Sequence, residues 1–484
     1  MPFDDLSLDN LESLFPAEYG PEKTARAKTA FFKNLSLALH RYYGGKIQVL
    51  PRCGIYSLNW FNLWYTPGVS KISTTIRDDR DASFELTGRG NTVAVVSDST
   101  RVLGDGDCGP SGGLGVMEGK ALLMKYLGGI DAVPLCIDSR GKDGKNDPEK
   151  LIDFVKMVQH SFGAVNLEDI SQPNCFRVLD ELRESCNIPV WHDDAQGTAC
   201  VTLAALINAL KLAGKPVDKA KIVLLGAGAA NSAIARFILA DGGRGENMAV
   251  FDNRGGLHPG RGDLRANAGA YRQWELCERT NPGRIDSIGE AVKGADVLIA
   301  LSSPGPDTVK REWVRSMASG AVVFACANPV PEIWPYAARE EGAYIVATGR
   351  GDFPNQVNNS ICFPGILKGV LAVRARKISD TMAIRCAHSI AEFASDRGIS
   401  TDNIIATVEE TDVFAREAAD VAMEARNEGL ARLDRSWDEV YNLARADIAA
   451  ARSLTGEMKR LGFIREPPPD LMQEILRQTL EEMS

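Results

Sequence analysis

Two pairs of neighbouring carboxylates are the first feature of this sequence that could do chemistry. Glu168 and Asp169 follow one short apolar run, and Asp193 and Asp194 follow another. Each run is typical of a buried strand, so each pair stands at the end of a strand, where ligands collect in open α/β sheets. Buried carboxylates are costly unless they are compensated, and a divalent cation that prefers hard oxygen ligands compensates them. The two pairs therefore predict a Mg²⁺ or Mn²⁺ site, whereas one pair alone would more often be a solvated turn or a helix cap.

A glycine-containing loop predicts a dinucleotide site. The hydrophobic strand "KIVLL" runs into "GAGAAN" (226–231), and a helix follows. Glycines at such a junction let the backbone approach a pyrophosphate, which then rests on the helix N-terminus. The residues expected to contact the cofactor are Gly226, Gly228, Ala229, Ala230 and Asn231. The alternative is a tight turn without a ligand, because an asparagine replaces the usual third glycine; the flanking strand and helix favour the dinucleotide.

The end of the next strand bears on the choice between NAD and NADP. Asp252 closes "MAVFD", where an acid can hold the ribose hydroxyls of the cofactor. An acid there repels a 2′-phosphate and favours NAD, but Arg254 could accept one. The sequence thus favours NAD and leaves NADP open.

Composition limits the class of protein and its partners. A chain of 484 residues is too long for one core and suggests two or three domains. The net charge of -9 argues against nucleic acid as a partner. The ten cysteines form no CxxC pair, which argues against a zinc ribbon or a disulfide framework and favours free thiols in a reducing cytosol. No signal segment is recognised and no apolar run approaches the roughly 20 residues that span a bilayer, so we expect a cytoplasmic protein with no membrane partner.

Strands and helices alternate along most of the chain, which predicts an α/β fold. A strand at 91–99 is followed by the glycine-dense stretch 103–115, expected to be a loop, then by a helix and a further strand. We predict an N-terminal α/β catalytic domain for substrate and metal (1–195) and a doubly wound Rossmann NAD(P)-binding domain (196–375). A helical C-terminal segment (376–484) is expected to pack back on the first domain or on a partner subunit.

Several motifs resemble those of the malic enzymes, the bacterial ones in particular. They run in order from residue 65 to residue 376: "YTPGV", "VAVVSDSTRVLGDGD", "VMEGKALLMKYLGGIDAVPLCID", "NLEDI", "HDDAQGTA", "GAGAAN" and "TGRGDFPNQVNNSICFPG". The resemblance implies oxidative decarboxylation of malate to pyruvate and CO2, with NAD(P)⁺ and Mg²⁺ or Mn²⁺. It also implies a homodimer or a homotetramer.

The resemblance assigns roles to the acidic pairs and to one lysine. Glu168, Asp169 and Asp194 match the metal ligands of the family, and Asp193 is left beside the ion as a charge on the catalytic lysine. Lys120 in "VMEGK" matches that lysine, the base that removes the hydroxyl proton. Neighbouring groups can lower the pKa of a lysine towards neutrality, and a metal ion can act as the Lewis acid. The alternative for Lys120 is a solvated side chain on a surface helix.

The remaining assignments concern proton donation and substrate binding. Tyr65 matches the acid that protonates C3 of the enolate, and Arg101 resembles the arginine that clamps a substrate carboxylate through two parallel hydrogen bonds. The residues expected beside the substrate or the nicotinamide are Asn328, Asn358 and Asn359. Taken singly, Tyr65 could be a packed aromatic and Arg101 could pair with a surface acid. The sequences that follow these two residues depart from the family pattern, so a related 2-hydroxy diacid stays open beside malate.

Three other functions compete with this interpretation. A malolactic-type decarboxylase would recycle bound NAD and release lactate, so it would give no net NADH. An amino-acid dehydrogenase would need no metal, so EDTA would leave it active. A non-catalytic regulatory or scaffold protein would keep only the nucleotide fold, against which the presence of Lys120, Tyr65 and three candidate ligands argues.

Overall fold

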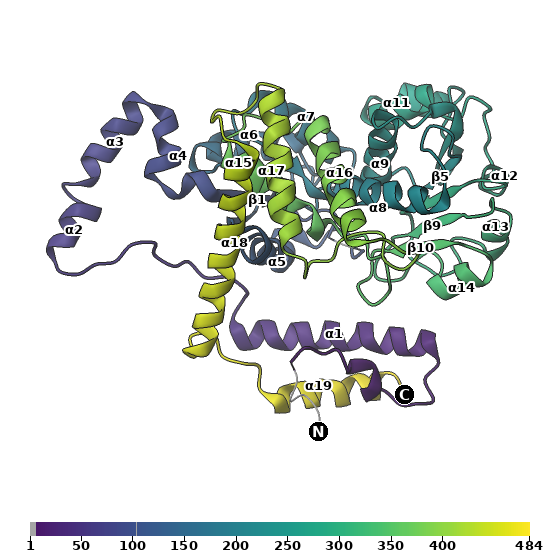
Figure 1. The fold of residues 1–484 in the computed structure, drawn as a ribbon, viewed down its shortest axis with the longest axis horizontal. Helices are drawn as coiled ribbons and strands as arrows, with labels where there is room; N and C mark the ends of the chain where they lie inside the picture. Colours follow the sequence, from purple (N-terminus) through teal and green to yellow (C-terminus); the bar gives the residue numbers. More distant parts are fainter. Residues whose placement is uncertain (1–5, 103) are drawn as a thin grey trace. The chain divides into compact units, whose positions relative to one another are not determined.

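The computed structural model describes residues 6–102 and 104–484, and the chain divides into two compact units (Figure 1). The smaller unit combines Met1–Leu50 with Ala451–Ser484, and the larger unit is Pro51–Ala450. The chain passes between the units after Leu50 and again after Ala450, within helix α18 (Trp437–Arg460). The predicted boundaries after residues 195 and 375 lie inside the larger unit and stay a prediction.

The smaller unit is built from both ends of the chain. Helix α1 (Pro21–Tyr43) packs against α19 (Pro469–Glu482), and a short helix, η1 (Leu11–Leu14), precedes α1. Proline begins α1 and α19, where its missing N–H costs nothing, and Gly44 ends α1 in the left-handed conformation. Their apolar faces bury Leu11, Phe15, Ala27, Phe31, Leu35, Met472 and Ile475.

The first sheet of the larger unit is parallel, with the strand order β2-β1-β3-β4. The strands are β1 (Thr92–Ser97), β2 (Asp131–Cys136), β3 (Ala164–Leu167) and β4 (Val190–His192). The helices that connect them are α5 (Gly109–Gly128), α6 (Pro148–Val158) and α7 (Asn174–Ser185). Strands β3 and β4 are buried throughout, as expected for a parallel sheet that is covered on both faces.

The glycine-dense stretch between β1 and α5 differs from the prediction. Helix α5 begins at Gly109, so residues 109–115, expected in the loop, form its first two turns. Pro110 suits the start of a helix. A Cβ on Gly113 would lie 1.9 Å from Oγ of Ser99, so this glycine allows the helix to pack closely against the end of β1. Close packing, rather than a flexible loop, explains the glycine.

The second sheet has the order β10-β9-β8-β5-β6-β7 and is parallel except for β7. Its strands are β5 (Ile222–Leu225), β6 (Met248–Asp252), β7 (Gly255–Gly256), β8 (Val297–Ala300), β9 (Val322–Ala325) and β10 (Ile345–Thr348). The strand order reverses beside β5, the place where doubly wound sheets bind nucleotides. The predicted Rossmann-type sheet is confirmed. The shorter helices around it are α10 (Gly262–Ala266), α11 (Tyr271–Arg279), α12 (Ile288–Ala291), α13 (Arg311–Arg315) and α14 (Pro335–Glu340).

Long helices complete the core of the larger unit. They are α8 (Thr198–Ala213), α9 (Ala229–Ala240), α15 (Phe363–Ala372), α16 (Asp380–Arg397) and α17 (Asp412–Asn427). Helix α16 packs against α8, and α17 packs against α15 and α5, so the C-terminal part is helical as predicted. One stretch, Asp193–Ala213, is long and apolar enough to cross a bilayer, which the sequence was not expected to contain. Because 78% of its apolar window is buried inside the protein, it fits a helix of the core.

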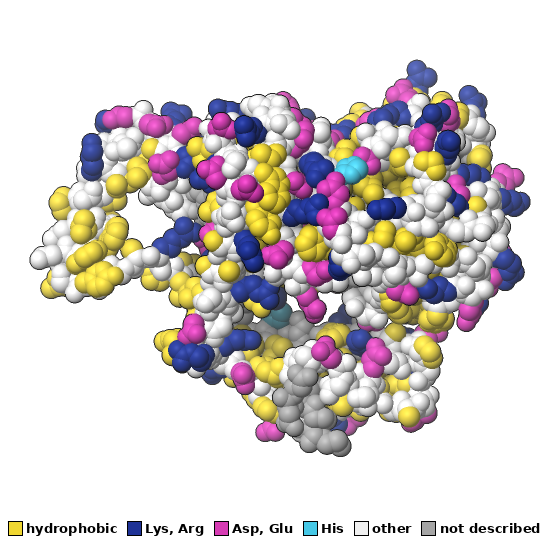
Figure 2. All heavy atoms as spheres, in the orientation of Figure 1, with side chains coloured by type: hydrophobic (Ala, Val, Ile, Leu, Met, Phe, Trp, Pro, Cys, Tyr) yellow, Lys and Arg dark blue, Asp and Glu magenta, His cyan; other side chains and the backbone are white. Residues whose placement is uncertain are grey.

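Residues 51–79, here called the arm, differ from the rest of the larger unit in their exposure. The arm contains α2 (Asn59–Trp64) and α3 (Val69–Asp78), and none of its residues, all of which are described, is buried. Large apolar side chains of the arm face solvent: Ile55, Tyr56, Leu58, Phe61, Leu63, Trp64 and Tyr65. Figure 2 shows them as a dense apolar group over α2. Monomeric proteins rarely leave such a patch uncovered.

Candidate active site

The register of two neighbouring strands brings the acidic pairs together. Leu167 at the end of β3 pairs with His192 at the end of β4, so the next residues, Glu168 and Asp193, emerge side by side. Oxygen atoms of Glu168, Asp169 and Asp194 lie within 4.8 Å of one another. Adjacent ligands of an octahedral Mg²⁺ ion are about 3 Å apart and opposite ligands about 4.2 Å, so side-chain shifts of about 1 Å would close the three around one ion. Their number, hardness and spacing fit a small divalent cation.

The backbone of Asp169 organises its neighbours. Asp169 has a φ of +52°, a left-handed conformation that Asp tolerates better than most residues. In this conformation its N–H donates to Oδ2 of Asp194 at 2.7 Å, and its carbonyl accepts from the N–H of Arg101 at 3.0 Å. Strained residues of this kind cluster at functional sites. One residue thereby positions a second carboxylate and the start of the loop that follows β1.

Asn166 supports Glu168 and was missed in the sequence. Its buried side chain donates to Oε2 of Glu168 at 2.9 Å. The available signal was a polar residue inside the otherwise apolar strand "AVNL". Burial raises the pKa of Glu168 well above its ordinary value, which favours the neutral carboxyl group. A cation bound nearby would act in the opposite direction and favour the ionised form.

Lys120 on α5 reaches the same place. Its ammonium group forms an ion pair with Asp193 and lies 3.2 Å from Oε1 of Glu168. It also lies 3.4 Å from Oδ1 of Asn359 and 4.4 Å from the ring centroid of Phe363. Burial lowers the pKa of Lys120, but the neighbouring carboxylates, Asp193 first among them, raise it by more. The expectation that its neighbours lower this pKa is therefore wrong: negative groups surround the lysine.

Asp193 is fixed from several sides. The indole N–H of Trp191 donates to its Oδ1 at 3.0 Å, opposite the contact with Lys120. A Cβ on Gly197 would lie 2.1 Å from the same oxygen, so only glycine fits there. Asp193 and Gly197 are the two ends of the short π-helical turn η5 (Asp193–Gly197), and such turns are frequent at functional sites. His192 caps this turn, since its Nδ1 accepts from the N–H of Ala195 at 3.2 Å, which is a structural role.

Of the three asparagines predicted to lie beside the substrate or the nicotinamide, one contacts Lys120. Asn359 contacts Lys120, whereas the side chain of Asn358 accepts from the N–H of Ser360 and caps the short helix η8 (Asn359–Ile361). Asn328 follows β9, and a Cβ on Gly104 would lie 3.0 Å from its backbone oxygen. The loop that carries Arg101 thus reaches the second sheet.

Tyr65 is not brought to the other predicted catalytic residues within this chain. It directly follows α2 in the arm, and it is 72% exposed. Figure 1 shows α2 well away from β1 and α5, the elements beside which Lys120 and the carboxylates lie. A proton donor at this position has to reach an active site by some contact other than those of its own folded chain.

The glycine loop has the geometry that a pyrophosphate needs. Gly226 has a φ of +105°, and a Cβ on it would lie 2.3 Å from the carbonyl oxygen of Leu301, so glycine is required. A Cβ on Gly228 would meet nothing within 4 Å, which leaves open space before α9 and its first residues, Ala229 and Ala230. The side chain of Asn231 is buried and donates back to the loop, to the carbonyls of Leu225 (2.9 Å) and Gly226 (3.1 Å). Asn231, at the position of the usual third glycine, thus stabilises the loop through its side chain.

The acid at the end of β6 is already paired. Arg261 donates to both carboxylate oxygens of Asp252, at 3.0 and 2.7 Å, and the backbone N–H of Arg254 adds a bond of 2.8 Å. The side chain of Arg254 extends to Asp263 at 3.3 Å. The negative charge of Asp252 is thus offset by an arginine that the sequence analysis did not identify.

A buried glutamate joins the ends of two strands beside Asn328. Glu332 is fully buried, and it accepts from the N–H groups of Ser302 after β8 (2.8 Å) and Ala327 after β9 (3.0 Å). Burial raises the pKa of Glu332 to about 6, although these hydrogen bonds act in the opposite direction. Its ionised form holds both loops at the nucleotide edge of the sheet.

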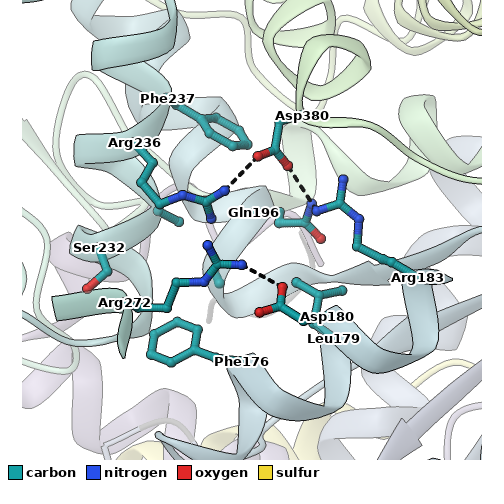
Figure 3. Close-up of a pocket in the computed structure, with 12 residues that line it drawn as sticks. Phe176, Leu179, Asp180, Arg183, Gln196, Ser232, Arg236, Phe237, Arg272 and Asp380 are labelled. Atoms are coloured by element: carbon teal, nitrogen blue, oxygen red, sulfur yellow. Dashed lines mark hydrogen bonds and ion pairs between the residues drawn. The ribbon is translucent and has the colours of Figure 1, made fainter. Parts of the chain in front are cut away.

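Ion pairs connect the helices of the two sheets (Figure 3). Arg183 of α7 and Arg236 of α9 both bind Asp380 at the start of α16, at 3.0 and 2.9 Å. Arg272 of α11 binds Asp180 of α7 at 2.5 Å. The cavity between them holds about 20 Å³, room for one water rather than a ligand. This cluster therefore serves as a connection between helices.

These features together define a class of protein. A Rossmann-type sheet with an open glycine loop, next to a lysine among carboxylates, defines a dinucleotide-dependent oxidoreductase. The model of the malic enzyme N-terminal domain matches residues 46–183, and that of the malic enzyme NAD-binding domain matches residues 195–426. The chain belongs to the malic enzyme family, NAD(P)-dependent oxidoreductases that oxidise and decarboxylate malate.

Individual relatives agree with this assignment. A crystal structure of Entamoeba histolytica malic enzyme is 57% identical, with a TM-score of 0.96 over 99% of this chain and 98% of that chain. The NAD-dependent malic enzyme of Geobacillus stearothermophilus is 42% identical over 394 residues, 81% of this chain and 79% of its own. A bifunctional malic/malolactic enzyme of Bacillus subtilis is 41% identical over 411 residues, 85% of this chain and 97% of its own. NADP-dependent malic enzymes match as well, at 40% identity in Halomonas elongata. The resemblance noted in the sequence motifs is confirmed.

Proposed function

We propose that malate is oxidised and decarboxylated at the carboxyl ends of β3 and β4, with Lys120 as the base. The observation that carries this proposal is the convergence of Lys120 and four carboxylates from β3, β4 and α5 on one small volume. The lysine offsets the charge of these buried carboxylates, and the same position would let it take a proton from a substrate hydroxyl.

Glu168, Asp169 and Asp194 would hold Mg²⁺ or Mn²⁺, as their oxygen donors and spacing fit such an ion. When bound, the cation supplies Lewis-acid stabilisation of negative charge on the substrate oxygens and offsets the charge of the ligands. Asn166 keeps Glu168 oriented through its hydrogen bond. The backbone contact between Asp169 and Asp194 keeps the other two ligands in register.

Lys120 would accept the hydroxyl proton in its neutral form, and the nicotinamide would supply the hydride acceptor for C2. A divalent cation held by Glu168, Asp169 and Asp194 would favour that neutral form, because it offsets carboxylates that raise the pKa of Lys120. Asp193, held by Trp191, fixes the position of the ammonium group and stabilises its charge after the proton has been taken up. Asn359 limits the movement of Lys120 on the opposite side. The nitrogen is thus kept within hydrogen-bond reach of one point, as proton transfer requires.

Arg101 would bind a carboxylate of the substrate. Its backbone is tied to Asp169, and its side chain is exposed, so the guanidinium group is free to form a bidentate pair next to the metal ligands. Asn328 and Asn358 would complete the pocket on the nicotinamide side. The open space before α9 and the pair of Asp252 with Arg261 would receive the pyrophosphate and the ribose.

Tyr65 would protonate C3 of the enolate, and its location supports a homo-oligomer. The arm exposes apolar side chains that a second copy of the chain would cover. We infer that the arm of one subunit lies on its partner and carries Tyr65 to the partner's Lys120. The unit of assembly would be a homodimer, alone or as half of a homotetramer.

NAD is the proposed cofactor, with NADP as the alternative. Asp252 stands where it would oppose a 2′-phosphate, which supports NAD. Arg261 and Arg254 beside it reduce that opposition, since one offsets the charge of Asp252 and the other has an exposed side chain. Relatives with either cofactor in their names match the chain at similar identity.

Malate is the proposed substrate, with a related 2-hydroxy diacid and a malolactic reaction as alternatives. The match to a bifunctional malic/malolactic enzyme keeps the second alternative in view. Net NADH formation from malate with Mn²⁺ separates oxidative decarboxylation from lactate release. The ten free cysteines agree with a proposed cytoplasmic location.

Replacement of single ligands tests the proposed centre. Asp194→Asn should abolish tight Mn²⁺ binding, measured by electron paramagnetic resonance, and lower kcat by at least about 100-fold. Lys120→Ala should lower kcat by about 100- to 10,000-fold while Mn²⁺ still binds. Asp138→Asn, a change at an exposed carboxylate, serves as the control. Full Mn²⁺ affinity in Asp194→Asn would place the cation elsewhere and overturn the proposal.

A further inference from the structure

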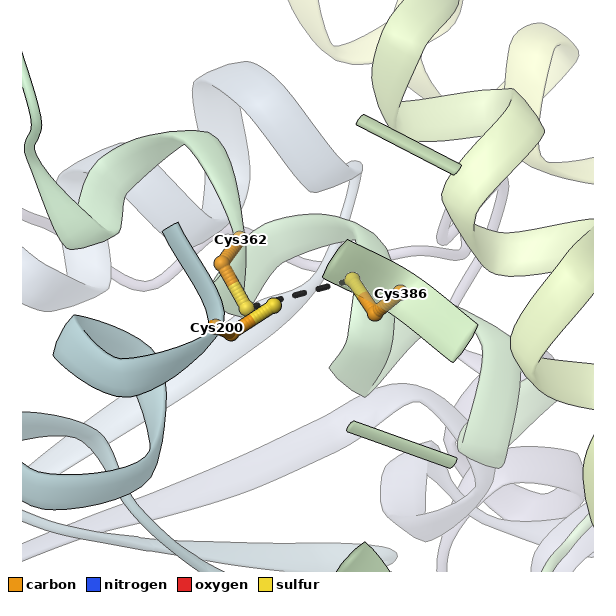
Figure 4. Close-up of side chains that lie close together, drawn as sticks. All are labelled: Cys200, Cys362 and Cys386. Atoms are coloured by element: carbon orange, nitrogen blue, oxygen red, sulfur yellow. Dashed lines mark hydrogen bonds between the residues drawn. The ribbon is translucent and has the colours of Figure 1, made fainter. Parts of the chain in front are cut away.

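Three cysteines from distant parts of the sequence meet in the core of the larger unit (Figure 4). Cys200 lies on α8, Cys386 lies on α16, and Cys362 directly precedes α15. All three are 0% exposed, and their Sγ atoms lie within 4.8 Å of one another. The absence of a CxxC pair gave no sign of this cluster, because the fold rather than a local motif assembles it.

The sulfur separations are those of metal ligands rather than of a disulfide. The Sγ atoms of Cys362 and Cys386 are 3.9 Å apart. A disulfide requires about 2.05 Å. Two thiolates on a tetrahedral zinc ion, each about 2.3 Å from the metal, stand about 3.8 Å apart. The third sulfur, of Cys200, is within about 1 Å of that separation.

A buried carboxyl group contacts one of these sulfurs. Glu417 of α17 is 0% exposed, and its Oε2 accepts from Sγ of Cys386 at 3.6 Å. Its Oε1 is buried and has no hydrogen-bond partner among the described residues. A buried polar atom without a partner is costly and calls for an explanation. A cation among the three sulfurs would provide one.

The surrounding helix makes room for this carboxyl group. A Cβ on Gly365 of α15 would lie 2.2 Å from Oε2 of Glu417 and would displace it. The neighbouring Gly369 lies equally close to the backbone of α17, where a Cβ would stand 2.5 Å from the carbonyl oxygen of Ala418. The two glycines, one turn apart, let α15 and α17 approach so that Glu417 reaches Sγ of Cys386 at the edge of the cluster.

We propose that Cys200, Cys362, Cys386 and Glu417 form a buried tetrahedral site for a thiophilic divalent cation of the zinc class. The three thiols and the carboxyl group of Glu417 each bind the cation in the deprotonated form and release a proton to solvent, so uptake is favoured by rising pH. The ion would join α8, α15, α16 and α17, four helices that contribute to one core. Its role would be structural, because four protein ligands leave no position open for a substrate.

The site is distinct from the carboxylate centre in its chemistry. Sulfur ligands select zinc-class ions, whereas the oxygen ligands Glu168, Asp169 and Asp194 select Mg²⁺ or Mn²⁺. Full burial also makes exchange slow, so a chelator that strips the open carboxylate centre should leave the sulfur site filled. The two sites can therefore be measured separately in one sample.

The test uses the full-length protein produced in zinc-supplemented medium and washed with EDTA under native conditions. Metal content per chain is measured by inductively coupled plasma mass spectrometry on wild type, Cys386→Ala, and the control Cys277→Ala, which changes an equally buried cysteine outside the cluster. Asp194→Asn is included to exclude zinc bound at the carboxylate centre. Protein produced with cobalt in place of zinc reports thiolate ligation directly, through sulfur-to-metal charge-transfer absorption.

We expect about one zinc per chain in wild type, Cys277→Ala and Asp194→Asn, and at least a fivefold lower content in Cys386→Ala. Cobalt-loaded wild type should show the charge-transfer band, and Cys386→Ala should lose it. Folded, active wild type that retains less than about a tenth of a zinc per chain would overturn the proposal, whatever the variants do. Zinc that persists in Cys386→Ala without a thiolate band would overturn it as well.

Discussion

Mixing two inactive variants tests how Tyr65 reaches an active site. Tyr65→Phe removes the hydroxyl group and keeps the aromatic ring of the arm, and Lys120→Ala removes the base from the core of the larger unit. Tyr65 is 72% exposed, whereas the side chain of Lys120 is 11% exposed and held among carboxylates. Each variant alone should lose about 100- to 10,000-fold in kcat.

The expected recovery follows from the number of sites in a dimer. If each site combines Lys120 of one subunit with Tyr65 of the other, a heterodimer of the two variants has one intact site and one doubly defective site. Random reassociation makes about half of the dimers mixed, so the mixture should recover about a quarter of wild-type activity. A purified heterodimer, isolated through two different affinity tags, should recover about half.

The assay is NADH formation from malate in the presence of Mn²⁺. Lys120→Ala mixed with Asp194→Asn is the matched control, because both lesions lie in the same part of the chain and every mixed site stays defective. Recovery in the first mixture alone supports the exchange of the arm between subunits. A purified Tyr65→Phe and Lys120→Ala heterodimer without activity would show that Tyr65 serves its own chain, and the reasoning from exposure would be refuted.

Four further perturbations test other parts of the site. EDTA should abolish turnover and leave the circular dichroism unchanged, and Mn²⁺ should restore the rate. Trp191→Phe removes a donor to Asp193 and should lower kcat/KM by about 5- to 100-fold with malate. Glu332 takes up a proton as pH falls through about 6 and then loses one acceptor for the strand-end loops, so the KM for NAD should rise below that pH. In Glu332→Gln this KM should be raised at all pH values and lose its dependence on pH. Asp252→Ala removes the carboxylate that opposes a 2′-phosphate and leaves Arg261, still paired with Asp263, beside that position. It should raise the ratio of kcat/KM for NADP over NAD by at least about 10-fold, measured with both cofactors.

Local patterns were sufficient to predict the sheets and the acidic centre. Runs such as "TVAVVS" and "IVLL" are β-branched and apolar, and they form β1 and β5. Because parallel strands end at one edge, carboxylates placed directly after Leu167 and His192 had to emerge together. The helix of "VMEGK" was also evident, which placed Lys120 on an element that packs beside β1 and β2 of the same sheet.

Features that depend on long-range packing were not predictable in this way. Glycine-rich sequence favours a flexible loop, so residues 109–115 were predicted to form one. They form the start of α5 instead, where the lack of a side chain on Gly113 allows the helix to pack against Ser99. The direction of the pKa shift of Lys120 depends on how many carboxylates converge around it, which no single segment shows. The partner of Asp252 follows nine residues later and had no motif to mark it. The exposure of Tyr65 depends on the packing of the whole arm.

The smaller unit can form only late in translation, because its two long helices come from opposite ends of the chain. Residues 44–468, 425 in number, separate the end of α1 from the start of α19. At 5–20 residues per second, roughly 20 to 85 s of translation pass before α1 can meet the helix that covers Phe31 and Leu35. During that interval the apolar face of α1 has to be shielded by something else, and a chain released early would keep it bare. Chaperone capture of nascent chains should therefore concentrate on α1 until synthesis reaches Met472.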